Sequence, residues 1–171
     1  LGKAINNAYK NIKDQKKFPL IYLTPRGKQL TQNKISQLSK KDGMILLCGR
    51  YEGIDQRVSD YYKIEEYSIG DFILAGGEIA AQALIESTVR LLPGTLGHKN
   101  SSTEESFNND LLEFPQYTRP KIWNNLEIPK VLTSGDHKKI ALWRKDMVEK
   151  LTKKIRPDLW KKYKKNKLIK K

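Results

Sequence analysis

The chain has 171 residues, with 33 Lys and Arg against 19 Asp and Glu and a formal net charge of +14. This length suits one domain, or one domain with a smaller second one. The single cysteine excludes an internal disulfide framework and a cysteine-rich zinc site, and no stretch of about 18 uncharged apolar residues is present to span a membrane.

Apolar periodicity predicts an α/β arrangement in the first part of the chain. The lysine-rich start lacks the apolar centre of a secretory signal, which predicts a cytoplasmic protein. The run "GMILLCG" is continuously apolar between its glycines, as in a parallel strand covered on both faces. The expected elements are a helix over 1–15, a strand over 20–23 ending at a Pro-Arg-Gly turn, a helix capped by Thr31 and running to Ser39, a strand over 44–48, a loop and short helix within "GRYEGIDQRVSDYY", a strand near 63–67 and a helix over 78–92.

The composition changes after the last of these helices. The segment "GHKNSSTEESFNND" is polar, and we expect a flexible linker over 97–113. It separates an α/β domain over 1–96 from a small helical domain over 114–171. In the latter, "HKKIALWRKDMVEKLTKKI" predicts one amphipathic helix, and a second begins at "RPDLWKKYKK" after Pro157.

Charge is unevenly distributed along the chain. Residues 1–40 carry a balance of +8, residues 41–135 one of −5, and residues 136–171 one of +11. Basic ends of this size concentrate polyanions at a protein surface, and the aromatics interleaved in "RPDLWKKYKK" favour a nucleic acid. The alternative is a set of solvated lysines on helix faces.

Three glycine-containing loops follow the apolar segments of the first domain: "TPRG" at 24–27, "CGRYEG" at 48–53 and "SIGDFILAGGE" at 68–78. In an open α/β sheet, ligands bind where loops leave the carboxyl ends of strands. Glycine lets main-chain groups approach a planar base, so these loops suit an adenine-containing cofactor. For any one loop taken alone, a simple turn is the favoured interpretation. Phosphate-binding glycine patterns are absent.

Several blocks occur in a fixed order: "LCGRYEGID", "YSIGDFILAGGE", "STVRLLPGTLGH", "FPQYTRP" and "VLTSGDHKKIALWR". In this order they strongly resemble the bacterial tRNA (guanine-N1)-methyltransferases, the TrmD type of the SPOUT superfamily. The resemblance covers nearly the whole chain. It implies methyl transfer from S-adenosyl-L-methionine to N1 of the guanosine immediately 3′ of the anticodon in tRNA.

The resemblance also implies an architecture. Family members have a SPOUT-type parallel sheet with a deep trefoil knot, a rare exception to the rule against threaded chains, followed by a small all-helical domain. They are homodimers whose cofactor and RNA sites are shared between two copies. They also carry a further N-terminal segment, so we expect this chain by itself to be poorly stable or inactive.

Residues that line the family's cofactor site can be matched by position. The match assigns cofactor binding to Leu23, Pro25, Gly49, Glu52, Ile69, Gly70, Leu74, Gly76 and Gly77. A mostly apolar, main-chain-lined pocket with a nearby carboxylate suits a cationic sulfonium cofactor. Glu52 is alternatively a solvated loop acid, and Ile69 and Leu74 are equally suited to the core.

Methylation at N1 needs a base, because N1 of guanine carries a proton at neutral pH, and a donor that stabilises charge on O6. The family places an aspartate in the linker, and the matching residue here is Glu105 in "STEESF", with Glu104 as a fallback. Glutamate has the same chemistry with one more methylene. Arg90 matches the arginine that faces O6. Glu105 is alternatively a solvated acid of the linker, and Arg90 alternatively forms a salt bridge on the helix surface.

The basic second domain is expected to bind tRNA, not DNA, through Arg119, Arg144 and Lys145. The family's dependence on Mg²⁺ is compatible with the acids present, but no residue is assigned as a metal ligand. A different function class remains open, namely a non-catalytic RNA-binding module derived from this fold. Binding of S-adenosyl-homocysteine would separate it from the enzyme.

Overall fold

The computed structural model describes residues 1–12, 18–50, 52–95 and 105–169. The chain divides into two compact units, Leu1–Gly97 and His98–Lys171. Within the described ranges, no helix is long and apolar enough to cross a membrane.

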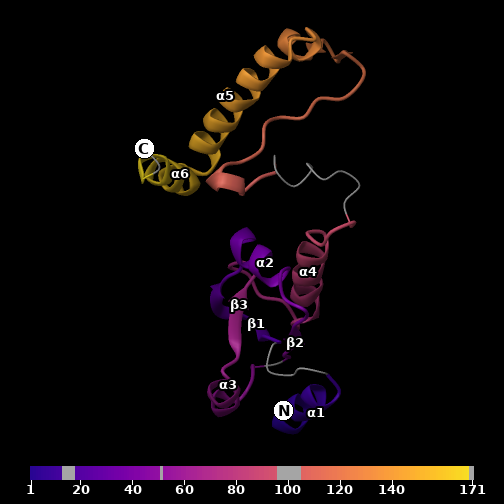
Figure 1. The fold of residues 1–171 in the computed structure, drawn as a ribbon, viewed down its shortest axis with the longest axis vertical. Coiled ribbons are helices and arrows are strands. Elements are labelled where there is room, and N and C mark those ends of the chain that lie inside the picture. Colours follow the sequence, from indigo (N-terminus) through magenta and orange to yellow (C-terminus); the bar gives the residue numbers. More distant parts are fainter. Residues whose placement is uncertain (13–17, 51, 96–104, 170–171) are drawn as a thin grey trace. The chain divides into compact units, whose positions relative to one another are not determined.

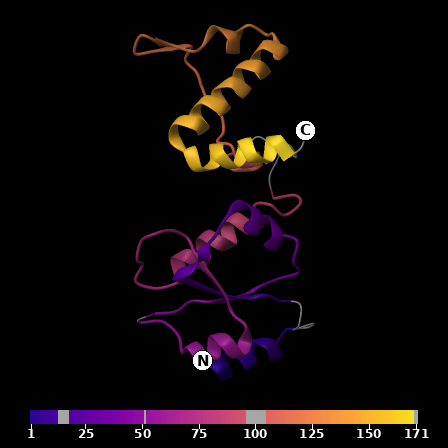
Figure 2. The ribbon, with the colours of Figure 1, turned by 90° about the vertical axis from the view of Figure 1, so that its left-hand side faces the viewer.

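The first unit is built on a three-stranded parallel sheet in the order β2-β1-β3. Helices α2 and α4 lie on one side of it, and α1 and α3 lie on the other (Figures 1 and 2). The elements are α1 (Gly2–Lys10), β1 (Leu20–Gln29), α2 (Gln32–Leu38), β2 (Ile45–Leu47), α3 (Gln56–Tyr62), β3 (Glu65–Ser68) and α4 (Glu78–Val89).

The core lies between the sheet and the α2–α4 pair. Because β1 is the central strand, all four residues of its "LIYL" run are buried, which is the pattern expected of a covered parallel strand. Alternate side chains of this run serve the two faces of the sheet. The main buried cluster consists of Ile21, Leu23, Ile35, Leu38, Ala80, Ala81 and Leu84.

Helices α2 and α3 each begin after a residue whose side chain caps the first turn. Thr31 caps α2, its hydroxyl accepting from the Lys34 N–H at 3.4 Å, as predicted. Asp55 caps α3 by accepting from the Arg57 N–H at 2.9 Å. The bidentate ion pair with the Arg57 guanidinium, together with this backbone hydrogen bond, lowers the pKa of Asp55 from 3.8 to about 2.

The predicted end of the first strand at Leu23 is wrong. β1 continues to Gln29, and both Leu23 and Lys28 pair with Tyr67 of β3, so residues 24–27 bulge out of the ladder. Gly27 makes the bulge possible, because a Cβ there would lie 2.5 Å from the Tyr67 backbone nitrogen. A locally turn-like "TPRG" is therefore incorporated into a strand.

The second unit contains two helices, α5 (His137–Ile155) and α6 (Pro157–Ile169), which match the predicted positions. A hairpin of β4 (Ile122–Trp123) and β5 (Leu126–Glu127) was not predicted. Short 3₁₀ segments cover Asn108–Asp110 and Lys130–Thr133.

Part of the expected linker is attached to this second unit. The Leu112 N–H donates to the Thr152 hydroxyl of α5 at 2.9 Å, and Asn166 of α6 donates to the Asp110 carboxylate at 2.8 Å. The segment that begins at Glu105 is thereby bound to both helices.

Candidate functional site

The bulged part of β1 and the loops that leave β2 and β3 line one cavity of about 260 Å³, here called the first cavity. Carboxyl ends of parallel strands lie at the same edge of a sheet, so the loops that follow them converge there. Its first wall is Tyr22, Leu23, Thr24 and Pro25; its second wall is Gly49, Arg50, Glu52 and Gly53; its third wall is residues 67–70 and 72–77, with Ala80.

The structure brings together all nine residues assigned to a cofactor from the sequence. They are Leu23, Pro25, Gly49, Glu52, Ile69, Gly70, Leu74, Gly76 and Gly77. Ile69 also packs against the main buried cluster, so its two proposed positions are compatible. Leu74 is 37% exposed and contributes to the cavity more than to the core.

The second and third walls meet backbone to backbone. The Gly77 N–H donates to the Gly49 carbonyl at 3.0 Å, and Arg50 forms a single antiparallel bridge with Gly76. A Cβ at Gly77 would lie 3.0 Å from Cys48 Cα, and one at Gly49 would lie 2.7 Å from the Tyr22 ring. Glycine at these two positions permits the close approach that forms the cavity.

An ion pair between Arg50 and Glu78 was missed by the sequence reasoning. The Arg50 Nε lies 2.9 Å from Glu78 Oε1, which joins the second wall to the first residue of α4. A backbone hydrogen bond at the start of α4, aided by the hydrogen bond from Arg50, lowers the pKa of the Glu78 carboxyl. The helix dipole favours the same charged state.

Arg90 is not part of the first cavity. It caps the carboxyl end of α4, its N–H donating to the Glu86 carbonyl at 3.1 Å, whereas the cavity adjoins the amino end. The thirteen residue-to-residue steps from Gly77 to Arg90 correspond to a rise of about 20 Å.

In the second unit, Glu105 lines another cavity of about 430 Å³, here called the second cavity, together with Arg144 and Lys145 of α5. The Arg144 guanidinium lies over the Phe114 ring, 4.5 Å from its centroid, which fixes its direction. Arg119 is exposed and is not among the lining residues. Glu104 falls outside the described residues.

The chemistry available is mainly that of main-chain groups and charged side chains. In the described parts of the chain, no three His, Cys, Asp or Glu side chains gather as a metal ion would require. The first cavity combines apolar side chains, main-chain groups at its glycines and the exposed carboxylate of Glu52. Such a site suits a flat, partly apolar ligand that carries a positive charge.

Comparison with known proteins identifies similar chains. Residues 2–162 match the family described as tRNA (Guanine-1)-methyltransferase TrmD. Three relatives are each a tRNA (guanine-N(1)-)-methyltransferase. The protein of a Ruegeria species is 54% identical over 163 residues, 95% of this chain and 66% of its own length. That of Bradyrhizobium diazoefficiens is 52% identical, covering 94% and 63%, and that of Caulobacter vibrioides is 56% identical, covering 83% and 58%. The chain thus spans about three fifths of the length of these relatives.

Proposed function

The chain belongs to the TrmD family of tRNA (guanine-1)-methyltransferases, and from this membership we propose that it methylates N1 of the guanosine immediately 3′ of the anticodon in tRNA. The methyl donor is S-adenosyl-L-methionine. The observation that carries the proposal is the convergence of all nine expected donor-binding residues on one cavity.

The residues of the first cavity fit this donor. Peptide groups of the second and third walls other than the paired Gly77 N–H and Gly49 carbonyl would hydrogen-bond an adenine edge, and the aliphatic side chains of Leu23, Ile69 and Leu74 would cover its faces. Glu52 lies where its carboxylate attracts a positive charge. When bound, the donor supplies an electrophilic methyl group on a sulfonium centre.

Glu105 acts as the base in this proposal. Its carboxylate accepts the N1 proton of guanine, and the electron pair left on N1 forms the bond to the methyl carbon while the methyl–sulfur bond breaks and its electron pair leaves with S-adenosyl-homocysteine. As the proton leaves, negative charge spreads to O6, where Arg90 stabilises it. Glutamate is longer than the expected aspartate by one methylene. The Glu105 side chain must therefore place its carboxylate at the same distance from guanine N1 in a different conformation.

A homodimer with a shared active site is part of the same proposal. Arg90 lies at the far end of α4 from the cavity of its own copy, so a second copy is the natural source of this group. Ile85 and Val89, one helical turn apart, and Leu92 beyond them present an exposed apolar surface beside Arg90. Such a surface is suited to a partner chain.

The remaining parts of the proposal concern fold and partner. We propose the SPOUT arrangement, with its trefoil knot, for the sheet of the first unit, and a tRNA-binding role for the second unit through Arg119, Arg144 and Lys145. The +11 balance of residues 136–171 supports an RNA partner. A tRNA substrate places the reaction in the cytoplasm.

The test is detection of N1-methylguanosine by mass spectrometry. A tRNA transcript with guanosine 3′ of the anticodon is incubated with S-adenosyl-L-methionine and Mg²⁺, using the 171-residue chain and a version extended by the N-terminal segment expected of the family. A transcript with adenosine at that position is the control. We expect product only with guanosine. Absence of product with both proteins would favour the RNA-binding module.

The role of Glu105 has its own test. Glu105→Gln should abolish methyl transfer while leaving the affinity for S-adenosyl-homocysteine unchanged, because the amide cannot accept the N1 proton. Single-turnover assays and calorimetry measure the two quantities. The matched control is Glu104→Gln, which should transfer normally. Near-normal transfer by Glu105→Gln would move the base role to Glu104 or to water.

A further inference from the structure

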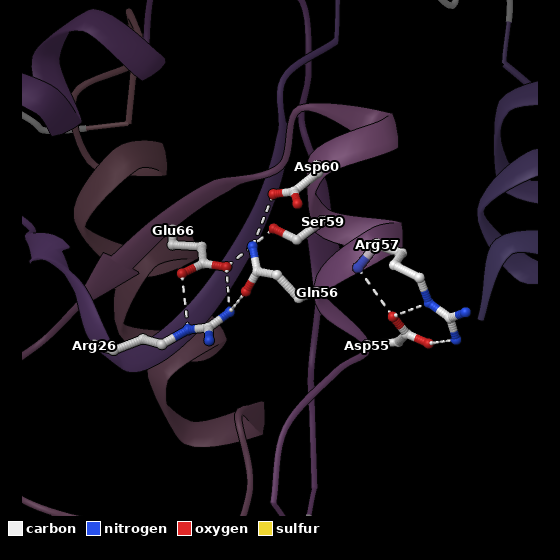
Figure 3. A network of polar contacts seen from close by, with 7 residues as sticks. All are labelled: Arg26, Asp55, Gln56, Arg57, Ser59, Asp60 and Glu66. Atoms are coloured by element: carbon white, nitrogen blue, oxygen red, sulfur yellow. Dashed lines mark hydrogen bonds and ion pairs between the residues drawn. The ribbon is translucent and has the colours of Figure 1, made fainter.

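The Arg26 guanidinium contacts side chains from two other elements. Its Nε lies 3.0 Å from Glu66 Oε2, and its Nη2 lies 2.9 Å from Glu66 Oε1 and 2.9 Å from Gln56 Oε1 (Figure 3). The paired nitrogens and oxygens form the two-pronged geometry that only arginine offers a carboxylate. One planar group thus joins the bulge of β1, the first turn of α3 and strand β3.

Both acceptors are themselves held in place. The hydroxyl of Ser59, which is 5% exposed, donates to Glu66 Oε1 at 3.0 Å. The Gln56 side-chain nitrogen donates to Asp60 Oδ1 at 2.8 Å, which turns its oxygen toward Arg26 (Figure 3). The carboxylate and the amide therefore present fixed acceptors and not freely rotating ones.

Each member of this network is close in sequence to one wall of the first cavity. Arg26 directly follows Pro25 of the first wall. Gln56 comes three residues after Gly53 of the second wall, and Glu66 comes three residues before Ile69 of the third. The bulge that carries Arg26 is pressed against β3 at Gly27, so little slack separates the guanidinium from the first wall.

We propose that Arg26 is a positioning residue that holds the three walls of the first cavity in one arrangement, through its fork to Glu66 and its bond to Gln56. The identity of the ligand rests on the proposed function, whereas the positioning does not. Arg26 is not among the lining residues of the first cavity but lines a separate pocket with Gln56 and Glu66, and it acts through the backbone of its neighbours.

The chain contains a matched control in the same region. Arg57 forms an equally close pair with Asp55, with Nη2 and Oδ2 2.6 Å apart (Figure 3). This pair lies within one turn of α3 and joins no two walls. Removing either guanidinium deletes one positive charge and one bidentate pair, but only Arg26 connects separate elements.

The first experiment measures binding of S-adenosyl-homocysteine by calorimetry to the 171-residue chain and to its variants. Arg26→Gln should raise Kd by about three- to tenfold, a range suited to a partly exposed ion pair that orders a site. Arg26→Lys should not restore affinity, because one ammonium cannot span three acceptor atoms. Arg57→Gln should leave Kd unchanged. Wild-type affinity in Arg26→Gln, or full rescue by lysine, would overturn the proposal.

The second experiment needs no ligand. Hydrogen–deuterium exchange is followed in peptides covering 22–28, 47–55 and 66–77, with the peptide of α4 as an internal reference. Arg26→Gln should speed exchange in all three peptides but not in α4, and Arg57→Gln should speed it only in 47–55. Faster exchange confined to 22–28 would overturn the proposal. A wild-type chain that binds no S-adenosyl-homocysteine would contradict the proposed function alone, since this comparison still decides the role of Arg26.

Discussion

At the scale of single residues, the first cavity depends on glycines, which have no side chain. Gly77 is the N-cap of α4, and a methyl group there would approach the Cys48 and Gly49 backbone to 3.0–3.2 Å, so that these atoms would have to move by a few tenths of an ångström. The atoms in the way are backbone atoms, which cannot rotate aside as a side chain would. Contact of this kind is relieved only by moving one wall of the cavity away from another.

We therefore expect Gly77→Ala to lower the free energy of unfolding by about 1–3 kcal/mol, the usual cost of overpacking. Binding of S-adenosyl-homocysteine should weaken in parallel, because the second and third walls separate. Urea unfolding followed by circular dichroism and calorimetric titration measure the two effects. Gly2→Ala is the control, since its added Cβ would meet the Tyr62 hydroxyl oxygen at an ordinary 3.5 Å. Equal effects at both glycines would contradict this reasoning.

At the scale of elements, one buried hydroxyl connects the segment after Glu105 to α5. Thr152 is 0% exposed, donates to the Val148 carbonyl at 2.8 Å and accepts from the Leu112 N–H at 2.9 Å. A buried N–H that loses its acceptor also loses the hydration it had in the unfolded chain. This hydroxyl is thus a fixed point for the segment that carries the proposed base.

Replacement of Thr152 by valine keeps the shape of the side chain but removes the acceptor. We expect a loss of about 1–3 kcal/mol in the free energy of unfolding. All three tryptophans of the chain lie in the second unit, so tryptophan fluorescence reports its unfolding. Thr133→Val is the comparison, because that exposed hydroxyl only donates within its own turn. A loss no larger than that of Thr133→Val would show that Leu112 finds another acceptor.

At the scale of the whole molecule, the concentration of basic residues near the C-terminus predicts salt-sensitive RNA binding. Each lysine that neutralises a phosphate releases a counterion, so removing it lowers the slope of log K against log salt by about one. Lys145 is exposed beside the second cavity, whereas Lys150 forms an ion pair with Asp146 at 2.7 Å.

Lys145→Ala should weaken tRNA binding and reduce this slope by about one, without altering affinity for S-adenosyl-homocysteine. Lys150→Ala removes the same charge but should change the slope less, because Asp146 already neutralises that ammonium. Fluorescence anisotropy across a salt series, at constant Mg²⁺, compares the two. An unchanged slope in Lys145→Ala would remove that lysine from the RNA-binding surface.

Local patterns in the sequence were sufficient for most elements of this fold. The apolar runs of β1 and β2, the cap at Thr31 and the periodicity of α5 each depend on neighbours in the chain. The extension of β1 past Pro25 could not be predicted this way, because proline and glycine signal a turn locally while β3, about forty residues later, recruits the segment as a strand.

In the candidate site, too, some features follow from the local sequence and others depend on tertiary contacts. Its glycine loops were visible in the sequence, and the family resemblance selected the residues within them. The partners of Arg26 and Arg50 were not visible, because each is set by tertiary contacts 28 or more residues away. The β4–β5 hairpin has a local signal in the sequence, the pair Asn124–Asn125. Asparagine tolerates positive φ, which both residues adopt and which a tight two-residue hairpin turn requires.

The position of β1 in the middle of its sheet affects the order of events on the ribosome. The strand is synthesised before both of its neighbours, and β3 ends at Ser68, 39 residues after the end of β1 at Gln29. At roughly 5–20 residues per second, about 2–8 s of translation separate the two strands. During that interval the nascent "LIYL" run lacks β3, the later of its two partner strands, and is a natural target for a chaperone that shields apolar segments. Completion of the sheet is therefore timed by the emergence of β3.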